Sequence, residues 1–430
     1  MRNGIGSARG SAVFLLWAAL AVPAAAQTRT DCTIPGQNLF VRNTLQDMYL
    51  WYSNLPDPNT ALFTSPEAYL EAVRYRPLDT SFSYITTQAS SDAFYSDSQF
   101  IGLGIGLKFE GDQLRLTEVY PASPASEAGL RRGYRIDAVN GVSVADLVAR
   151  GEIGGAFGPS DIGYSILVRF RDLAGAEGEV RMTKRLVTIP TVSGTRVFDV
   201  DGRRVGYLVF RNFVQPSVDA LTAAFDELRA QGANELVLDL RYNGGGLVSV
   251  AQQLGGQIGG AATSGQTFVR FVHNDKNSFR DLSLLFPSLT ASLNLSRLVV
   301  IATRSSASAS ELVINSLRPF IPVTVVGDRT FGKPVGQYGF PFCGKVLYPV
   351  AFTGKNARSD PDYFGGIPAD CRAPDDLDHA LGDAAEASLA EGLHYVAAGS
   401  CTAAAAQARA AVAPRRPVTR DGWRQLVGAY

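Results

Sequence analysis

The chain has 430 residues, of which 46% are hydrophobic and 19% charged, a composition typical of a globular protein with more than one domain. Forty basic side chains balance forty acidic ones. Because no net charge is available to attract nucleic acid or anionic lipid, we expect neither as a partner.

The first 26 residues differ from the rest of the chain. Arg2 and Arg9 precede an apolar run at residues 12–21, and small residues follow up to Gln27. This order is typical of a secretory signal peptide, and the run is too short for a comfortable membrane anchor. We therefore expect residues 1–26 to be a signal peptide and the protein to be exported, periplasmic or secreted, with no integral membrane span in the mature chain.

The cysteines give information about the compartment and little about metals. No two of them form a CxxC pair, so a metal site is poorly supported. In an oxidising compartment an even number favours one or two disulfides, with free buried thiols as the alternative. Three complete pairings are possible among Cys32, Cys343, Cys371 and Cys401.

Residues 27–98 are expected to form an N-terminal helical cap and a linker. Apolar residues recur at helical spacing between positions 38 and 78. One face would be formed by Phe40, Val41, Leu45, Met48 and Tyr49, and another by Tyr69, Leu70 and Val73. The serine-rich residues 86–98 have the composition of an exposed connection.

Residues 99–188 are rich in predicted strands and glycine turns. A glycine-punctuated turn at 101–107 runs into an alternating strand, a second strand follows at 114–120, and a short helix precedes a strand and turn at 134–141. This order resembles a PDZ domain of the kind associated with bacterial proteases, rather than a sandwich whose glycines only make turns. Such domains bind a peptide C-terminus by strand addition. The resemblance implies that the terminal carboxylate is held by loop N–H groups of Gly102, Leu103, Gly104 and Ile105.

Between residues 189 and 401 strands alternate with helices. Strands are expected at 205–210, 236–240 and 298–302, and helices at 217–231, with Ser217 as N-cap, and at 309–317. Strands joined by helical crossovers imply an α/β fold with a mainly parallel sheet covered on its faces. The alanine-rich residues 402–430 show no core pattern, and we expect a loosely attached tail.

Several familiar sites are missing from the sequence. It contains no HExxH, GxSxG or CxxC motif, and none of His273, His379 and His394 stands beside a strand-end serine. Residues 327–333 (GDRTFGK) match the start of a phosphate-binding loop, but Pro334 stands where a Ser or Thr must bind magnesium. We expect no metal and no organic cofactor.

Three motifs do follow one another in order. They are LDLRYNGGG at residues 238–246, SSASASE at 305–311, and TFGK at 330–333 with Gln337 beyond it. This set resembles the S41 peptidases, the family of C-terminal processing or tail-specific proteases. The resemblance covers the PDZ-like segment and nearly all of the chain from about residue 205 to 367. It implies a crotonase-like (ClpP-like) ββα protease core in residues 189–401.

The resemblance also implies roles for single residues. The nucleophile falls on Ser308, its general base on Lys333, and the residue that orients the lysine on Gln337. An oxyanion hole would be formed by the N–H groups of Ala309 and Gly245. The sequence departs from many relatives at Pro334, where they have glycine, and at Gly244, where they have proline.

The chemistry places demands on these residues. A lysine can act as a base only when neutral, and its ordinary pKa of about 10.4 keeps it charged at pH 7 unless burial disfavours the charge. We therefore expect Lys333 in a site shielded from water and without an acidic neighbour. Ser308 is expected at the start of a helix, where free N–H groups stabilise developing negative charge. On its own, the pair Ser308 and Glu311 fits a simple capping box.

Together these features predict a serine endopeptidase that hydrolyses exported polypeptides through an acyl-enzyme and holds their free C-termini in its PDZ domain. An oligomer is compatible with the sequence. Two other classes of protein remain as alternatives: a non-proteolytic ligand carrier on the same scaffold, and a peptide-binding adaptor that works through the PDZ domain alone.

Overall fold

The computed structural model describes residues 31–409. The expected signal peptide and the end of the expected tail lie outside the described residues. Among the residues that are described, no helix is long and apolar enough to cross a membrane.

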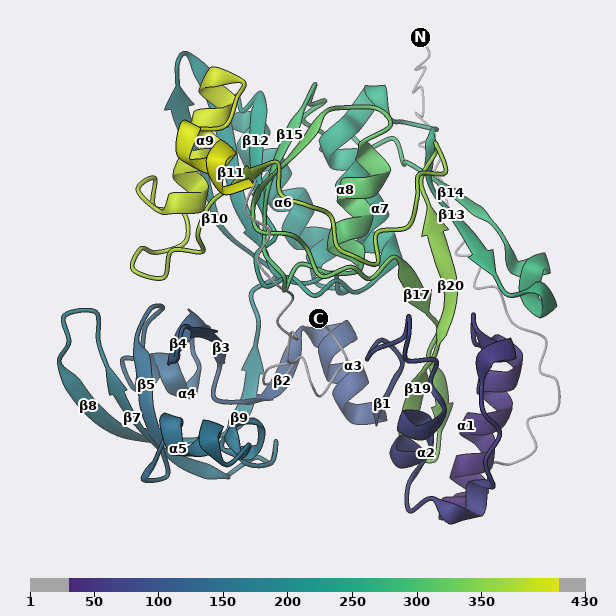
Figure 1. Ribbon diagram of the computed structural model, residues 1–430. Helices are drawn as coiled ribbons and strands as arrows, with labels where there is room; N and C mark the ends of the chain where they lie inside the picture. Colours follow the sequence, from purple (N-terminus) through teal and green to yellow (C-terminus); the bar gives the residue numbers. More distant parts are fainter. Residues whose placement is uncertain (1–30, 410–430) are drawn as a thin grey trace, which may run out of the picture.

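The largest part of the molecule is built on a six-stranded sheet, in the upper half of Figure 1. The strands run parallel from β11 to β21, and β10 is antiparallel to β11. Their order across the sheet is β10 (Val192–Val200), β11 (Arg203–Phe210), β12 (Glu235–Asp239), β15 (Leu298–Ala302), β16 (Val323–Gly327) and β21 (Cys371–Arg372). The fold is thus a mixed α/β fold.

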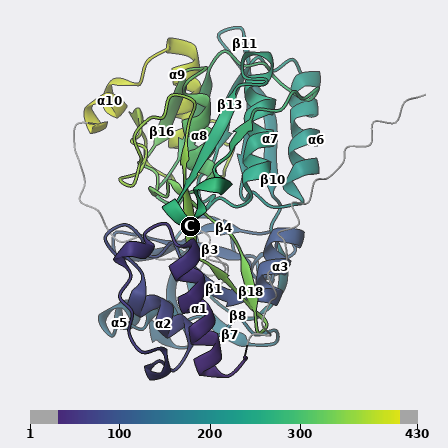
Figure 2. The ribbon, with the colours of Figure 1, turned by 90° about the vertical axis from the view of Figure 1, so that its right-hand side faces the viewer.

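Helices cover both faces of this sheet (Figures 1 and 2). One face carries α6 (Ser217–Ala230), α7 (Val248–Gly259) and α8 (Ala309–Leu317), and the other carries α9 (Ala387–Ala398) and α10 (Ala403–Arg409). Alternate residues of β12 divide between the two layers, because successive strand residues point to opposite faces. Leu236 and Leu238 pack in the core with α6, α7 and α8, whereas Val237 packs with Leu389 of α9.

The expected strands and helices of this part agree with the structure within two residues at their ends. Ser217 is an exception in its role. It is the first helical residue rather than the N-cap, which is Pro216, and its hydroxyl donates a hydrogen bond to the Asn212 carbonyl at 2.8 Å. The proline at the cap position shifts the serine into the first turn.

Residues 99–188 form a separate β-rich unit at the lower left of Figure 1. Its main sheet has the order β3-β4-β5-β7-β8, with β6 (Val142–Ser143) on β5. The strands are β3 (Ile105–Glu110), β4 (Gln113–Val119), β5 (Arg135–Val139), β7 (Ser165–Arg171) and β8 (Glu177–Thr183), and the helices are α4 (Pro124–Glu127) and α5 (Val144–Ala149). The pair β2 (Gln99–Gly102) and β9 (Arg185–Thr188) closes the unit where the chain enters and leaves it.

The N-terminal helices α1 (Ile34–Met48) and α2 (Pro66–Val73) lie beside a long excursion of the α/β part of the chain. That excursion contains β17 (Val335–Gln337), β18 (Phe340–Phe342), β19 (Lys345–Tyr348) and β20 (Val350–Lys355). β20 pairs with β13 (Thr267–His273), which pairs with β14 (Ser283–Leu285). The two predicted apolar faces are largely buried in one cluster with Leu347 and Val350, which fastens the helices to the excursion.

The expectation that residues 86–98 form an exposed connection is wrong. β1 (Tyr84–Thr87) pairs with β19, and a helix, α3 (Gln88–Asp97), follows it. Thr87 caps this helix by accepting a hydrogen bond from the Ser90 N–H, and Phe94 is fully buried. The serine-rich composition predicts a loop, but the packing of a few aromatic side chains, among them Phe94, stabilises a helix.

Two disulfides join distant segments, Cys32 to Cys343 and Cys371 to Cys401. The second one fastens the start of the expected tail. Beyond it α10 is ordered as a helix, and Ala405 is 3% exposed. Residues 403–409 are therefore a docked helix and not a loose tail.

Candidate active site

The three sequence motifs meet at one edge of the sheet. β12, β15 and β16 are parallel neighbours, with Asp239 opposite Ile301 and Ala302 opposite Gly327. Their carboxyl ends therefore lie at the same edge, where α/β folds commonly place their sites. The glycine turn at 240–246, the serine loop at 303–308 and the lysine loop at 328–334 are the segments that leave this edge.

Hydrogen bonds connect the serine loop to the glycine turn. The Ser306 hydroxyl donates to the Leu240 carbonyl at 2.7 Å, and the Ala307 N–H donates to the Asn243 carbonyl at 3.0 Å. The Ser310 hydroxyl donates to the same Asn243 carbonyl at 3.0 Å. Ser308 is thereby held at the N-terminus of α8, as predicted, with φ of 55°, a left-handed conformation that is uncommon for serine.

Glu311 joins the serine loop to the lysine loop. Its fully buried carboxylate accepts hydrogen bonds from the Ser308 N–H at 3.0 Å and the Lys333 N–H at 2.8 Å. It also accepts from the Gly332 N–H at 2.7 Å and the Thr330 hydroxyl at 2.5 Å. Burial raises the pKa of Glu311 to about 7, while these four donors oppose the rise.

The structure corrects the expectation that no acidic residue lies beside Lys333. Glu311 is such a neighbour, although it contacts the backbone N–H of the lysine. The capping interpretation of Glu311 is right for Ser308 but incomplete, because the same carboxylate binds the lysine loop. A local cap can be recognised in the sequence, whereas the contacts of Glu311 with Thr330, Gly332 and Lys333 join distant positions and cannot.

The side chain of Lys333 is shielded, as expected, with 5% of the residue exposed. Its Nζ donates to the Gln337 Oε1 at 2.7 Å and lies 5.9 Å from the centre of the Phe82 ring. The Gln337 amide nitrogen donates to the carbonyls of Phe82 at 2.8 Å and Tyr348 at 2.7 Å. Since the nitrogen faces two acceptors, the amide oxygen must face the lysine. The N-terminal segment thus fixes the neutral partner of Lys333.

The glycine turn lies tightly against the serine. A Cβ placed on Gly245, whose φ is +100°, would lie 2.8 Å from the Ala309 nitrogen and from the Ser308 Cβ. Only glycine tolerates this approach and this conformation. The Ala309 N–H is the first of α8, so no earlier carbonyl of the helix can accept it.

One expected oxyanion donor has another partner here. The Gly245 N–H donates to the Asn243 Oδ1 at 2.9 Å, so it is engaged within the turn. Gly244 and Gly246 line the cavity beside Ser308, whereas Gly245 does not. The asparagine side chain, two residues before the glycine, was not recognised as an acceptor from the sequence.

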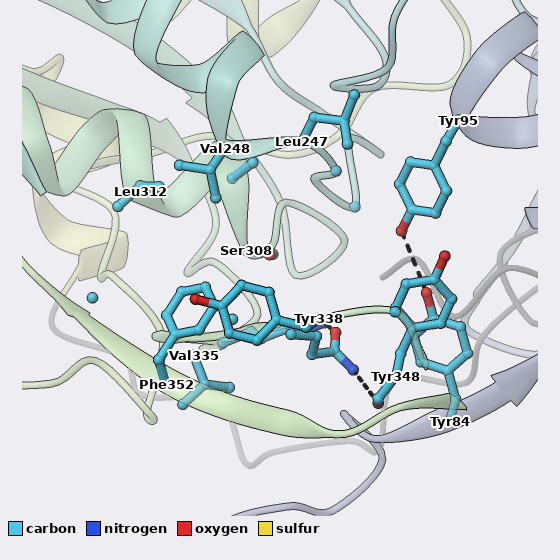
Figure 3. Close-up of a pocket in the computed structure, with 18 of the residues that line it drawn as sticks. Tyr84, Tyr95, Leu247, Val248, Ser308, Leu312, Val335, Tyr338, Tyr348 and Phe352 are labelled. Carbon is cyan, nitrogen blue, oxygen red and sulfur yellow. Dashed lines mark hydrogen bonds between the residues drawn. The ribbon is translucent and has the colours of Figure 1, made fainter. Parts of the chain in front are cut away.

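A cavity of about 480 Å³ opens over these loops, and Figure 3 shows Ser308 in its wall. Lys333 and Gln337 also line it. Ala309 lies beside Ser308 on the same wall. Tyrosines from the N-terminal segment and β19 form the opposite side: Tyr84, Tyr95 and Tyr348. Tyr95 lies in the serine-rich residues 86–98, whose composition predicts an exposed connection, so sequence reasoning missed it as a cavity residue. The cavity therefore brings together the nucleophile and base that the sequence predicts.

Asp239 and Arg241 form a buried ion pair at the end of β12. The Arg241 guanidinium is fully buried and donates to Asp239 at 2.6 Å and to Glu386 at 2.7 Å. Arg132, from the β-rich unit, donates to the Tyr242 hydroxyl at 2.8 Å. These contacts hold the strand end from which the glycine turn starts.

The predicted carboxylate-binding loop, residues 102–105, lies in the β-rich unit between β2 and β3. Its carbonyls have internal partners, since Leu103 accepts from the Ala125 N–H at 3.0 Å and Gly104 from the Tyr120 N–H at 2.9 Å. β3, which begins at Ile105, is an edge strand of its sheet. The loop is therefore placed where an added strand would begin.

Within residues 31–409, Cys371, Glu391 and Cys401 are the group whose spacing could suit a metal ion. The two cysteines form a disulfide, which removes both thiolates as ligands.

Residues 204–355 match peptidase family S41, and residues 36–84 match the peptidase S41 N-terminal domain. These two segments of the chain are thus similar to S41 peptidases. The chain is 30% identical over 242 residues to a carboxyl-terminal-processing protease of Synechocystis, which covers 55% of this chain and 53% of the relative. It is 24% identical over 327 residues to the carboxy-terminal processing protease CtpB of Bacillus subtilis, which covers 72% of this chain and 66% of the relative. The chain thus spans between about half and two thirds of these curated relatives.

Two solved structures of proteases are similar to the chain in fold. A putative S41 protease from Bacteroides fragilis has a TM-score of 0.67 at 26% identity, over 84% of this chain and 97% of that one. The photosystem II D1 C-terminal processing protease has a TM-score of 0.52 at 21% identity, over 83% of this chain and 99% of that one, which is a similarity of fold. The S41 match includes the glycine turn, Ser308, Lys333 and Gln337.

Proposed function

We propose that this S41 protein is an exported serine endopeptidase in which Ser308 is the nucleophile and Lys333 its general base. One observation carries the proposal. The Lys333 side chain is buried, its Nζ donates to a neutral amide, and it lines the same cavity as Ser308, which stands at the N-terminus of a helix.

The proposed reaction has two stages. Ser308 Oγ attacks the carbonyl carbon of the scissile peptide bond while neutral Lys333 takes the hydroxyl proton. The lysine then passes this proton to the leaving amine, which departs and leaves an acyl-enzyme. Water attacks the ester with Lys333 again as base, and the proton returns to Ser308.

The oxyanion of each stage needs fixed donors, each of which contributes about 2.7–4 kcal/mol. The Ala309 N–H is one candidate by its position at the start of α8. Gly245 remains the second donor in our proposal. Its N–H would then leave the Asn243 Oδ1 and donate to the substrate oxyanion instead. Gly244 and Gly246 line the cavity and are the alternatives within the same turn.

We further propose that residues 99–188 are a PDZ domain that binds the free C-terminus of a polypeptide substrate. Its support is the edge position of β3 directly after the loop of residues 102–105. In the same proposal residues 27–98 form the cap and residues 189–401 a crotonase-like core. Export is supported by the two disulfides, which form in oxidising compartments.

The test compares hydrolysis of casein and of quenched-fluorescence peptides by the wild type and three variants. Ser308→Ala and Lys333→Arg should each lose at least about 10³-fold in kcat. The first variant lacks the hydroxyl nucleophile, and in the second the guanidinium cannot release its proton to act as a base. Lys345→Met is the matched control, since Lys345 is ion-paired with Glu67 and should keep wild-type turnover.

Hydrolysis retained by Lys333→Arg would refute lysine as the base. Equal results for the wild type and Ser308→Ala, including no hydrolysis by either, would indicate a non-proteolytic carrier instead.

A further inference from the structure

The cavity has an apolar end next to Ser308. Leu312 lies one helical turn beyond Ser308 on α8, so both side chains lie on the same face of the helix. Val248 from α7 and Val269 from β13 line the cavity with it, and so does Phe352 from β20. These side chains belong to, or pack against, the main core, which makes this wall stiff.

Tyr338 closes this apolar end. It follows Gln337, the partner of Lys333, and its ring packs 5.2 Å from that of Phe352 (Figure 3). The Tyr338 hydroxyl lies 3.0 Å from the His273 Nε2, and the two rings are stacked within 4° of parallel. The Tyr338 ring therefore forms part of the cavity wall, and its hydroxyl is held by a hydrogen bond to His273.

The histidine is itself held in place. The Asp281 carboxylate lies 2.9 Å from the His273 Nδ1 and accepts the His273 backbone N–H at 2.9 Å. A carboxylate can only accept, so Nδ1 carries a hydrogen. In the neutral imidazole the Nε2 must then accept the proton of the Tyr338 hydroxyl. Burial raises the pKa of this hydroxyl, so Tyr338 keeps its proton.

The catalytic proposal above gives His273 no role, although its side chain is fully buried. A buried imidazole with both nitrogens engaged restrains whatever it binds. Here it binds Tyr338, a side chain that lines the cavity. Its effect must therefore pass through the position of the Tyr338 ring.

We infer that Tyr338 is a specificity-determining residue, held by His273 and Asp281 as positioning residues, and that it limits the substrate residue before the scissile bond to small and medium apolar side chains. The inference rests on the proposed function. The rigid rings of Tyr338 and Phe352 set the depth of the apolar end. The Tyr338 proton is committed to His273, so this wall offers no donor to an acidic side chain.

The experiment measures kcat/KM for peptides that differ in one residue, Ala, Val, Phe, Trp or Glu, before the cleaved bond. The readout is the ratio of Trp to Val, which does not depend on the amount of folded enzyme. The wild type should favour Val by at least about tenfold, a difference of about 1.4 kcal/mol in transition-state binding. Tyr338→Ala should reverse or abolish this preference.

Variants that remove only the tether test the positioning residues. Tyr338→Phe and His273→Asn should each weaken the Val preference about threefold, and the double variant should add nothing further. His379→Asn is the matched control, because His379 also bonds an aspartate, at 2.7 Å, but is not among the residues that line the cavity. It should leave the ratio at its wild-type value.

An unchanged ratio in Tyr338→Ala, or additive effects in the double variant, would overturn the inference while hydrolysis by the wild type upholds the proposed function. Labelling of Ser308 by a fluorophosphonate separates the two cases. A wild type that neither labels nor cleaves any peptide of the series would overturn both.

Discussion

Replacing Glu311 with glutamine tests whether one buried carboxylate holds the serine and lysine loops together. Each carboxylate oxygen accepts two donors: Oε1 accepts Thr330 and Gly332, and Oε2 accepts Ser308 and Lys333. Glutamine keeps one oxygen and turns an NH₂ group toward the other pair. Each buried donor left without an acceptor costs about 1–3 kcal/mol, so Glu311→Gln should lose about 2–6 kcal/mol of stability.

The loss should depend on pH in a defined direction. The pKa of Glu311 rises from 4.5 to about 7 on folding, a difference of about 3 kcal/mol at about 1.4 kcal/mol per pKa unit. The folded protein binds this proton more tightly than the unfolded chain. The contribution is therefore fully present below about pH 4.5 and is lost as the pH rises through about 7. Glutamine does not titrate, so the stability gap between wild type and variant should narrow by about 3 kcal/mol from acid to alkaline pH.

Urea unfolding at about pH 5 and about pH 8, with peptide hydrolysis alongside it, measures both effects. Separation of the loops should lower kcat by at least about 100-fold, since small misplacements of reacting groups are that costly. Glu391→Gln is the matched control, because the Glu391 carboxylate is also buried, with 6% of the residue exposed, and also accepts a backbone hydrogen bond, from the Thr402 N–H. It should lose stability and keep kcat. A gap that does not change with pH, together with wild-type kcat in Glu311→Gln, would refute the reasoning.

Three further predictions concern other parts of the molecule. Replacing Cys371 and Cys401 by serine opens a loop with a sequence separation of 30 and should cost about 3–4 kcal/mol in denaturant unfolding; unchanged stability would contradict the chain-entropy argument. Arg132→Met removes one cation from Asp375 and should lower kcat more than it changes KM. Arg135→Met, which breaks an ion pair within the same unit, is the control. Equal kcat in the two variants would count against a coupling between the β-rich unit and the glycine turn. Amidating the C-terminus of a peptide substrate should raise KM about tenfold at constant kcat, and an unaltered KM would argue against carboxylate binding.

The sequence predicts the parts of the fold that depend on local pattern. The apolar run at 298–302 and the periodic run at 309–317 coincide with β15 and α8, because both are buried and lack polar interruptions. Parallel strands place their carboxyl ends at one edge, so the meeting of the loops that carry Ser308 and Lys333 could be expected before any coordinates. The family resemblance supplied the roles of these residues, which the pattern alone did not.

Contacts between distant segments could not be predicted in this way. Residues 88–97 have a serine-rich composition that is typical of a loop, yet buried Phe94 and the pairing of β1 with β19 stabilise a helix there. The pairing of His273 with Tyr338 joins positions 65 residues apart, and neither side chain belongs to a motif. For Gly245 the reason is subtler, because the Asn243 side chain two residues earlier competes for the same N–H.

A cluster of buried charged side chains lies at the end of β12, next to the glycine turn. Burying Arg241 and Asp239 costs desolvation energy that their pairing at best repays, so the cluster is a weak source of stability. Its more direct effect is on conformation. Tyr242 has φ of 63°, an uncommon value for an aromatic residue, and its hydroxyl donates to Asp375 at 2.6 Å.

Asp375 connects this turn to the β-rich unit. Burial alone would raise its pKa, but Lys108, Arg132 and Arg241 hold the pKa below the usual range, so the carboxylate is ionised at neutral pH. Two of these three cations come from residues 99–188. A shift of that unit would withdraw positive charge from Asp375 and loosen the tether of Tyr242, two residues before the glycines beside Ser308. The conformation of the glycine turn is therefore physically coupled to the placement of the β-rich unit through the charges around Asp375.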